Sequence, residues 1–324
     1  MHILIIGAAG MLGRKTARRL ADRGTLRGKA IDRLTLVDVV PPASPEGFAG
    51  RIETAVHDLS QPGTADRLIA ERPDVVIHLA AIVSSDAEAN FEKGYAINLD
   101  GTRALFEAIR RVADYCPRVV FTSSVAVFGA PLPATIGDDH ILTPLTSYGT
   151  QKAIGELLLA DYSRRGFLDG VGIRLPTICV RPGAPNKAAS GFFSNILREP
   201  LKGEPAVLPV ADTVRHWFAS PRAAVEYIIH AAELDSALLG TRRNLTMPGI
   251  CATVADEIDA LRRVAGDAAV ALISREPNPA IADIIAGWPE AFETRRAEAL
   301  GFKPDASFDE IIRIHLEDEM GGAR

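Results

Sequence analysis

The first 23 residues constrain the fold more than any other stretch, because they combine a strand-like run, a glycine-rich turn and a helical pattern. Residues 3–6 form a short, continuous apolar run, typical of a strand buried on both faces of a parallel sheet. The turn that follows is Gly7-Ala8-Ala9-Gly10-Met11-Leu12-Gly13, and residues 14–23 have helical periodicity. The order predicts the first strand, turn and helix of an α/β fold with a parallel sheet.

The glycines of this turn predict a phosphate-binding site. Gly7 suits a tight turn, Gly10 lets backbone approach a pyrophosphate, and Gly13 lets the helix lie close to the strand. The start of the helix, with Met11 and Leu12, offers free N–H groups and the positive end of the helix dipole. We therefore expect these five residues to contact a dinucleotide.

The second strand predicts which dinucleotide is bound. Residues 34–37 are strand-like and end at Asp38, whose carboxylate can accept hydrogen bonds from both ribose hydroxyls and repels a 2′-phosphate. This favours NAD over NADP. The interval from Gly13 to Asp38 exceeds the usual spacing of about 20 residues, because residues 23–33 look like an insertion. Arg14 could compensate a 2′-phosphate, so NADP stays open.

Strand-like runs and helical patterns continue to alternate along the first half of the chain. Further strand-like stretches cover residues 51–57, 75–79, 119–122 and 171–175. Six strands alternating with helices predict a Rossmann-type, doubly wound parallel sheet in residues 1–175. We expect residues 176–324 to form mainly a smaller substrate-binding lobe, with some elements returning to the sheet. Helical stretches there cover residues 222–234, 254–265 and 308–319.

Several small or polar residues stand where the predicted strands end, which is where open α/β sheets bind ligands. Asp58 could accept from an adenine amino group or cap the next helix. His78 stands inside an apolar run, so we expect a hydrogen-bonded core histidine. The remaining candidates for cofactor contact are Leu59, Leu79, Ala80, Ala81, Ser123, Pro176 and Thr177.

Tyr148 and Lys152 carry the predicted chemistry. Residues four apart share one face of a helix, so a positive charge would lie beside a phenol and stabilise the phenolate. A phenolate within about 3 Å of a hydroxyl can remove its proton while hydride leaves the carbon. Lys152 would also hold the nicotinamide ribose, and Ser124 would orient the substrate oxygen. Asn98, placed inside a long helical segment from 87 to 113, could anchor a water that passes the proton to bulk.

The order of these motifs resembles the extended short-chain dehydrogenase/reductase family, in its nucleotide-sugar epimerase-like branch. The resemblance covers residues 1 to about 180 and implies that Ser124, Tyr148 and Lys152 form a catalytic triad, assisted by Asn98. Phe128 stands where many members carry Tyr, which alters the substrate pocket. The motifs are Gly7-x-x-Gly10-x-x-Gly13, Asp38, Asp58-Leu59, His78-Leu79-Ala80-Ala81, Asn98-x-x-Gly101-Thr102, Ser123-Ser124-x-x-Val127-Phe128-Gly129 and Tyr148-x-x-x-Lys152.

The second half of the chain bears on the substrate. Its motifs resemble family members that use NAD to oxidise a four-carbon sugar acid at carbon 2: Arg174-Leu175-Pro176-Thr177-Ile178, Arg181-Pro182-Gly183, Asn186-Lys187 and Ser190-Gly191-Phe192-Phe193. A sugar acid needs a guanidinium for its carboxylate, and Arg215 is the first candidate. Further candidate substrate contacts are Ser84, Ser124, Tyr148, Ser190 and His216.

Alternatives to this substrate assignment stay open. Arg215 could form a surface ion pair, and Ser190 could cap a helix. A nucleotide-sugar epimerase or dehydratase that holds NAD tightly would use the same triad. A regulator that only senses NAD would not need the base.

Composition narrows the partners and the compartment. Apolar residues are 47% and charged residues 24%, and the net charge of −5 is spread along the chain, so we expect no nucleic-acid or membrane partner. The three cysteines include no Cys-x-x-Cys, and no close pair of histidines is present, so we expect no metal. A strand-like N-terminus without a signal peptide predicts a cytoplasmic protein.

The same resemblance predicts a homodimer. Residues 96–112 and 151–164 look like the helices through which this family forms two-fold dimers, although a tetramer stays open.

Overall fold

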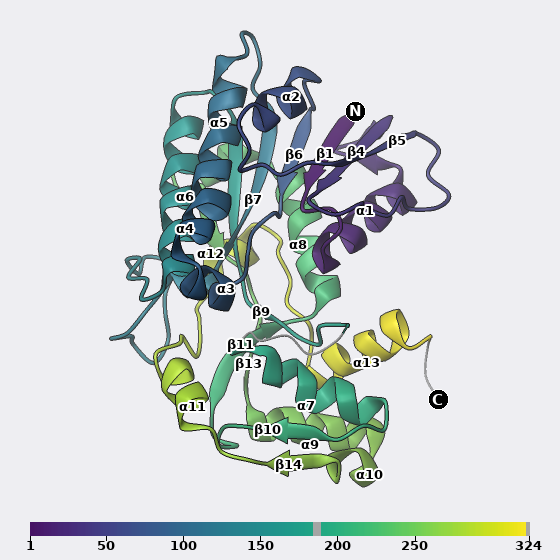
Figure 1. The fold of residues 1–324 in the computed structure, drawn as a ribbon, viewed down its shortest axis with the longest axis vertical. Helices are drawn as coiled ribbons and strands as arrows, with labels where there is room; N and C mark the ends of the chain where they lie inside the picture. Colours follow the sequence, from purple (N-terminus) through teal and green to yellow (C-terminus); the bar gives the residue numbers. More distant parts are fainter. Residues whose placement is uncertain (184–188, 322–324) are drawn as a thin grey trace. The chain divides into compact units, whose positions relative to one another are not determined.

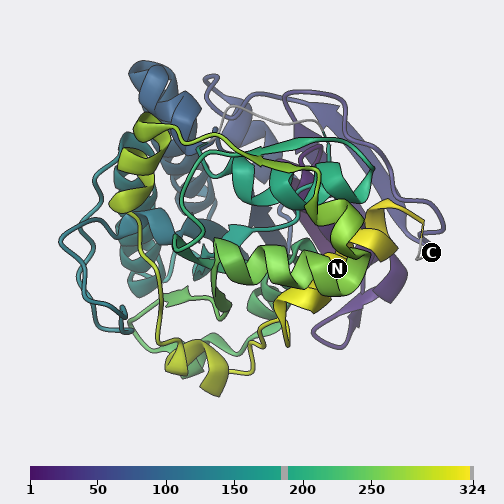
Figure 2. The same cartoon turned by 90° about the horizontal axis from the view of Figure 1, so that it is seen from below.

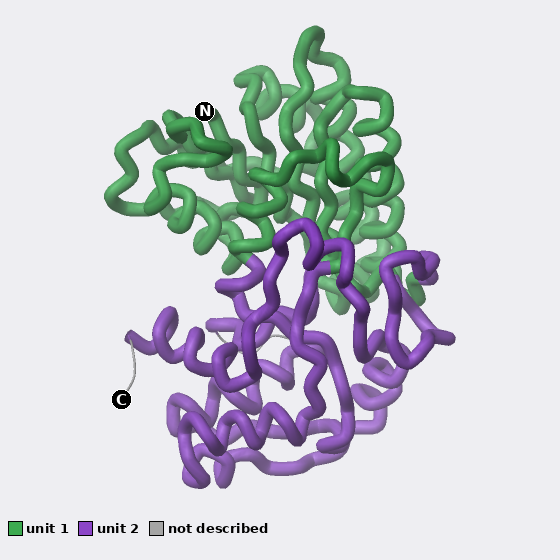
Figure 3. Tube along the Cα trace, turned by 180° about the vertical axis from the view of Figure 1, so that it is seen from behind, with its two compact units in different colours: residues 1–127, 144–174, 225–246 green, residues 128–143, 175–224, 247–324 purple. Residues whose placement is uncertain are grey.

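The computed structural model describes residues 1–183 and 189–321, which split into two compact units (Figure 3). Unit 1 comprises residues 1–127, 144–174 and 225–246, and unit 2 comprises the described residues of 128–143, 175–224 and 247–324. Residues 128–143 lie within the range 1–175 that the sequence assigns to the first domain, yet they belong to unit 2. Residues 225–246 return to unit 1 from the second half of the chain.

A seven-stranded sheet forms the centre of unit 1. Strand order runs outward in both directions from β1, so the topological switch lies between β1 and β6, as in dinucleotide-binding folds. Six strands match the sequence prediction, and a seventh, β12, joins the edge beside β8. In sheet order the strands are β12 (Asn244–Thr246), β8 (Asp169–Leu175), β7 (Arg118–Ser124), β6 (Val75–His78), β1 (His2–Ile6), β4 (Arg33–Asp38) and β5 (Arg51–Val56).

Helices cover the sheet of unit 1. Helices α2 (Thr64–Ala70), α5 (Gly101–Arg111) and α6 (Ser147–Arg164) pack on the sheet through one buried apolar cluster. Helices α1 (Met11–Arg23) and α8 (Pro221–Glu233) lie together on the other side (Figure 1). Two ion pairs join them at 2.7 Å, Arg19–Glu226 and Arg23–Glu233.

The predicted continuous helix over residues 87–113 is wrong, because the structure breaks this segment into shorter pieces. Helices α3 (Ser84–Ala89) and α4 (Phe91–Gly94) precede a π-helical turn, η1 (Tyr95–Asp100), and α5 follows. The π-helical turn contains the buried Asn98, whose side chain bonds outside its own helix. Such turns are frequent at functional sites.

Short elements complete unit 1. The insertion predicted at residues 23–33 forms a small hairpin of β2 (Thr25–Leu26) and β3 (Lys29–Ala30). Two 3-10 turns are η2 (Val125–Val127) and η3 (Ser236–Leu239).

Unit 2 contains two small sheets and a separate core. One sheet pairs β10 (Ala206–Leu208) with β14 (Ile273–Arg275), and the other has β11 (Arg215–Ala219) between β13 (Ile250–Thr253) and β9 (Thr177–Ile178). Helices α9 and α13 lie side by side (Figure 2). The helices are α7 (Gly191–Leu201), α9 (Val254–Ala265), α10 (Asp267–Val270), α11 (Pro279–Ala286), α12 (Arg295–Ala299) and α13 (Phe308–Glu319). Across residues 1–183 and 189–321, no helix is long and apolar enough to cross a membrane.

Helix α6 packs so closely on β7 that position 155 has room only for glycine. A Cβ added there would stand 2.7 Å from Cζ of Phe121, which is fully buried. We expect Gly155→Val to lower the free energy of unfolding by about 2–3 kcal/mol, because the core would be overpacked. Urea unfolding measures this. Gly137→Val is the control, since an added Cβ there meets nothing within 4 Å; equal stability of the two variants would contradict the packing.

Candidate active site

The glycine turn after β1 is shaped first by the protein's own packing. Gly7 has φ +92°, and a Cβ there would stand 2.6 Å from the backbone nitrogen of Ala80. A Cβ on Gly13 would stand 2.1 Å from the carbonyl oxygen of Gly7. The turn is thereby brought against residues 79–81 after β6, so these two predicted groups of cofactor contacts lie together.

Gly10 differs from these two glycines, because the protein leaves room beside it. An added Cβ would meet only the carbonyl oxygen of Gly7, at 3.4 Å, and residue 10 is exposed. Gly10 is the N-cap of helix α1, which has no side-chain cap and no acidic residue in its first turn. Free N–H groups at such a helix start suit an anion, so the residues fit the diphosphate of a dinucleotide.

Asp38 stands beside the same turn. Its two carboxylate oxygens accept hydrogen bonds from the backbone N–H groups of Ala9, at 2.8 Å, and Val39, at 2.7 Å. Each oxygen has a second lone pair for a ribose hydroxyl. The predicted ribose contact is therefore held in place at the end of β4.

Asp58 is held by its own loop. It accepts bonds from the N–H (2.9 Å) and the hydroxyl (2.7 Å) of Ser60. Burial opposes ionisation of Asp58, but these bonds outweigh it and lower the pKa. The alternative that Asp58 caps the next helix is wrong, because Gly63 occupies that position. Leu59, beside it, is buried in the core of unit 1.

Asn98 ties the segment after β6 to α6. Its amide group donates to the carbonyl of Ile82 (3.2 Å) and to Oε1 of Gln151 (2.7 Å), and its Oδ1 accepts from the N–H of Ile82 (2.9 Å). Both amide hydrogens thus have protein partners, and the side chain positions its neighbours. Its predicted role in holding a water stays a prediction. Ser84 follows two residues after Ile82, at the start of α3.

Tyr148 lies in the first turn of α6, which Thr146 caps by accepting from the N–H of Gly149 (3.0 Å). A Cβ on Gly149 would stand 2.2 Å from the carbonyl oxygen of Ala126, so only glycine lets the helix approach here. The N–H of Ala126 in turn donates to Oγ of Ser124, at 3.1 Å. Ala126 therefore lies against Gly149, the residue after Tyr148, and bonds Ser124.

Lys152 is buried and points at the end of β7. Its Nζ donates to the carbonyl of Thr122 at 2.8 Å and stands 5.7 Å from the centre of the Tyr148 ring. Burial lowers the pKa of Lys152 from its usual value to about 8, and the charge of Glu156 opposes this shift. The predicted pairing of a phenol with an ammonium is present in the structure.

His78 confirms the expectation of a hydrogen-bonded core histidine. It is buried, and Nε2 lies 2.9 Å from the hydroxyl of Thr102. Burial and then the charge of Lys152 lower the pKa of His78 to about 3. His78 is therefore uncharged, and it lies close enough to Lys152 to be affected by the charge of Lys152.

In unit 2, His216 and Thr177 bond each other. Nε2 of His216 lies 2.7 Å from the hydroxyl of Thr177, and Nδ1 lies 3.1 Å from the carbonyl of Pro289. The ring is buried and stacks on Phe193. Burial lowers the pKa of His216 to about 4. Both ring nitrogens have protein partners, so the predicted substrate contact of His216, which stays a prediction, requires one of these bonds to break.

Ser190 and Arg181 form a second polar contact in unit 2. Nη2 of Arg181 donates to Oγ of Ser190 at 3.1 Å. Elsewhere in this unit, Pro176, a predicted cofactor contact, directly precedes β9. Asn186 and Lys187, which contributed to the resemblance, lie outside the described residues.

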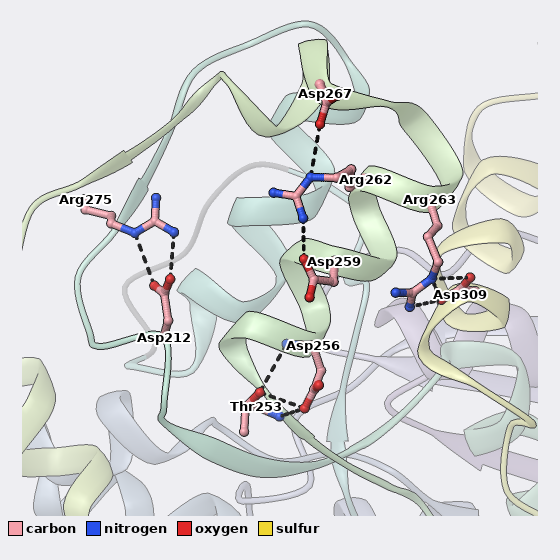
Figure 4. A network of polar contacts seen from close by, with 9 residues as sticks. All are labelled: Asp212, Thr253, Asp256, Asp259, Arg262, Arg263, Asp267, Arg275 and Asp309. Carbon is pink, nitrogen blue, oxygen red and sulfur yellow. Dashed lines mark hydrogen bonds and ion pairs between the residues drawn. The ribbon is translucent and has the colours of Figure 1, made fainter.

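Arg215 differs from its buried neighbour His216, because its side chain is exposed and forms no ion pair with any described residue. It pairs across the sheet with Thr253, which forms a reciprocal cap with Asp256 at the start of α9 (Figure 4). Hydrogen bonds from Thr253, and then the charge of Arg215, contribute to lowering the pKa of Asp256.

Sequence reasoning gave no role to three polar residues that bond one another or the predicted site residues: Gln151, Glu156 and Arg174. Gln151 holds Asn98, and Glu156 forms a bidentate ion pair with Arg174. Glu156 follows Lys152 by four residues, so the same spacing that paired Tyr148 with Lys152 could have placed it on the inner face of α6.

The strand order, the glycine turn and the Tyr148–Lys152 pair define a dehydrogenase of the short-chain type, built on a Rossmann sheet. The chain belongs to the NAD dependent epimerase/dehydratase family, whose model matches residues 3–237.

Three relatives illustrate the similarity. D-erythronate dehydrogenase of Cupriavidus necator is 50% identical over 322 residues, 98% of each chain, and that of Haemophilus influenzae is 43% identical over 99% of this chain and 100% of its own. A crystal structure described as the nucleoside-diphosphate-sugar epimerase from Agrobacterium tumefaciens is 62% identical, covers 100% of this chain and 95% of its own, and superposes with a TM-score of 0.98.

The contacts of Asp38 lead to a binding prediction. We expect Asp38→Asn to weaken NADH binding about tenfold, because a charged acceptor of ribose hydroxyl bonds is lost. The preference for NADH over NADPH should shrink, because repulsion of the 2′-phosphate is removed. Calorimetric titration with both dinucleotides measures this. Asp22→Asn is the control, since Asp22 only pairs with Arg18 on the exposed side of α1; unchanged NADH affinity in Asp38→Asn would rule out the ribose contact.

Proposed function

We propose that this protein uses NAD to oxidise the C2 hydroxyl of a small sugar acid, converting D-erythronate to 2-oxo-tetronate. The observation that carries the proposal is the buried ammonium of Lys152 beside the ring of Tyr148 at the end of β7. Two relatives named D-erythronate dehydrogenase, similar over almost the whole chain, support the choice of substrate.

In the proposed reaction, Tyr148 removes the hydroxyl proton of the substrate. Bound NAD supplies the acceptor for the hydride that leaves C2. Lys152 stabilises the phenolate of Tyr148 through its positive charge, and burial strengthens this interaction because water screens it less. Below a pH of about 8 the ammonium is present, and above it the charge is lost.

Ser124 would orient the substrate oxygen. Its Oγ accepts a hydrogen bond from the N–H of Ala126, so its hydroxyl hydrogen remains for donation to a substrate oxygen. Donation to the oxygen that reacts stabilises charge developing there.

Recognition of the substrate carboxylate is proposed for Arg215. Its exposed guanidinium, without an ion pair among the described residues, can form two parallel bonds with a carboxylate. Ser190 remains a secondary candidate, with Ser84 for the hydroxyl groups of the substrate. The proposal also includes a cytoplasmic location and a homodimer formed by residues 96–112 and 151–164.

A second candidate function is epimerisation or dehydration of a nucleotide sugar. It is favoured by the description of the Agrobacterium tumefaciens relative as a nucleoside-diphosphate-sugar epimerase. The same triad would serve, but NAD would be regenerated in each turnover.

Product formation separates the two functions. We expect the purified protein to reduce added NAD with D-erythronate, and much more slowly with other four-carbon sugar acids, followed by absorbance at 340 nm. NADP is run in parallel. NAD carried through purification, with conversion of a UDP-sugar and no net reduction, would instead establish the epimerase.

The role of Tyr148 has its own test. We expect Tyr148→Phe to lower kcat by about three orders of magnitude, because general-base catalysis is lost while the ring remains. NADH affinity should stay within about twofold. Tyr162→Phe is the control, since that hydroxyl bonds Glu107 on α5. Full activity of Tyr148→Phe would refute the mechanism.

A further inference from the structure

Glu156 places a carboxylate in the interior of unit 1, one helical turn after Lys152. Its side chain is only 1% exposed. Oε1 accepts from the hydroxyl of Ser123 at 2.5 Å, and both oxygens accept from the guanidinium of Arg174, at 2.7 to 3.1 Å. A carboxylate is costly to bury, and four hydrogen bonds from two partners compensate this cost.

These contacts join α6 to three strands. Lys152 bonds the carbonyl of Thr122 and Glu156 bonds the hydroxyl of Ser123, so consecutive turns of α6 hold consecutive residues of β7. Arg174 belongs to β8 and also donates to the hydroxyl of Thr246 in β12, at 3.3 Å. The carbonyl of Glu156 accepts from the side chain of Asn244 in β12, at 3.2 Å.

The charges around Lys152 come from few groups. On α6, Tyr148 lies one turn before it and Glu156 one turn after it. From β6 the neighbouring titratable group is His78, which burial keeps neutral. From β7 come a carbonyl group and the ring of Phe121, whose centre is 5.0 Å from Nζ. Glu156 therefore supplies the negative charge that favours the ammonium.

We propose that Glu156 is a positioning residue, which keeps Lys152 charged and holds Ser123 at the end of β7, with Arg174 as its compensating cation. This inference rests on the proposed function, because the charge of Lys152 matters only if Tyr148 acts as the base. Neither Glu156 nor Arg174 touches the reacting atoms in this scheme.

Arg174 is the cation that pairs with the carboxylate of Glu156. Its two-pronged contact compensates the buried carboxylate of Glu156. Its positive charge acts on Lys152 in the direction opposite to the charge of Glu156, so removing Arg174 should not have the same electrical effect as removing the charge of Glu156.

The test compares Glu156→Gln with the wild-type protein. Gln is similar in size and still accepts a bond from Ser123, but it has no charge. Titration of lysines labelled with ¹³C and ¹⁵N, followed by NMR and assigned with Lys152→Arg, should show Lys152 losing its proton about one pH unit lower. The alkaline decline of kcat/KM for sugar-acid oxidation should move down by the same amount.

Arg174→Gln is the second variant. Glu156→Gln leaves an unpaired guanidinium in the interior and can impair folding. Arg174→Gln removes a positive charge and keeps Glu156, so we expect the titration of Lys152 not to fall by the one pH unit expected for Glu156→Gln. Glu156→Asp keeps the charge, and it should restore most of the wild-type titration even if kcat falls.

The matched control is Asp169→Asn. The ion pair Arg118–Asp169 also joins β7 to β8, but at the opposite end of both strands. We expect this variant to lose stability without moving the titration of Lys152. A shift in Asp169→Asn equal to that in Glu156→Gln would overturn the proposal.

An unchanged titration of Lys152 in folded Glu156→Gln would also overturn it, because a purely structural ion pair predicts that result. A fall of one pH unit in folded Arg174→Gln would overturn it as well, because the lost positive charge should oppose such a fall. The NMR comparison does not depend on turnover. A wild-type protein that oxidises no sugar acid would therefore refute the proposed function separately, while the titration still decides the part played by Glu156.

Discussion

The close contact of α6 with the carboxyl end of β7 is the constraint on which the site depends. Gly149 and Gly155 allow this contact, because a side chain at either position would collide with Ala126 or Phe121. Only at this separation can Lys152 reach the carbonyl of Thr122. Tyr148 then stands over the strand ends where a doubly wound sheet binds its ligand. Helix packing, rather than a flexible loop, therefore positions Tyr148, the proposed base.

Close packing has an electrostatic consequence. The same contact that excludes water from Lys152 makes its ammonium costly, and burial lowers its pKa to about 8. The charge of Glu156 opposes this fall, so losing it would lower the pKa of Lys152 further. The neutral His78 supplies no negative charge, so the ammonium is stabilised by the carboxylate of Glu156 and the carbonyl of Thr122. The packing that buries Lys152 is therefore also the reason that its ammonium needs the charge of Glu156 nearby.

Most of the first unit could be predicted from the sequence, because its signals are local. Strand-like runs marked β1, β4, β6 and β7, and the glycine turn marked the start of α1. Elements set by distant partners could not be predicted. Strand β12 has only three residues and exists through its pairing with β8. The π-helical turn η1 depends on the bonds of Asn98 to residues 16 and 53 positions away.

In the candidate site, too, local patterns could be predicted and contacts between distant residues could not. The residue pair Tyr148 and Lys152 follows from helical spacing alone, but the pairing of Glu156 with Arg174 joins a helix to a strand and left no local pattern. Arg215 and His216, which are adjacent in the sequence, were both predicted to contact the substrate. In a strand, adjacent side chains point to opposite faces, and here His216 is buried while Arg215 is exposed. Because His216 has protein partners for both ring nitrogens, a carboxylate that binds at β11 should meet Arg215.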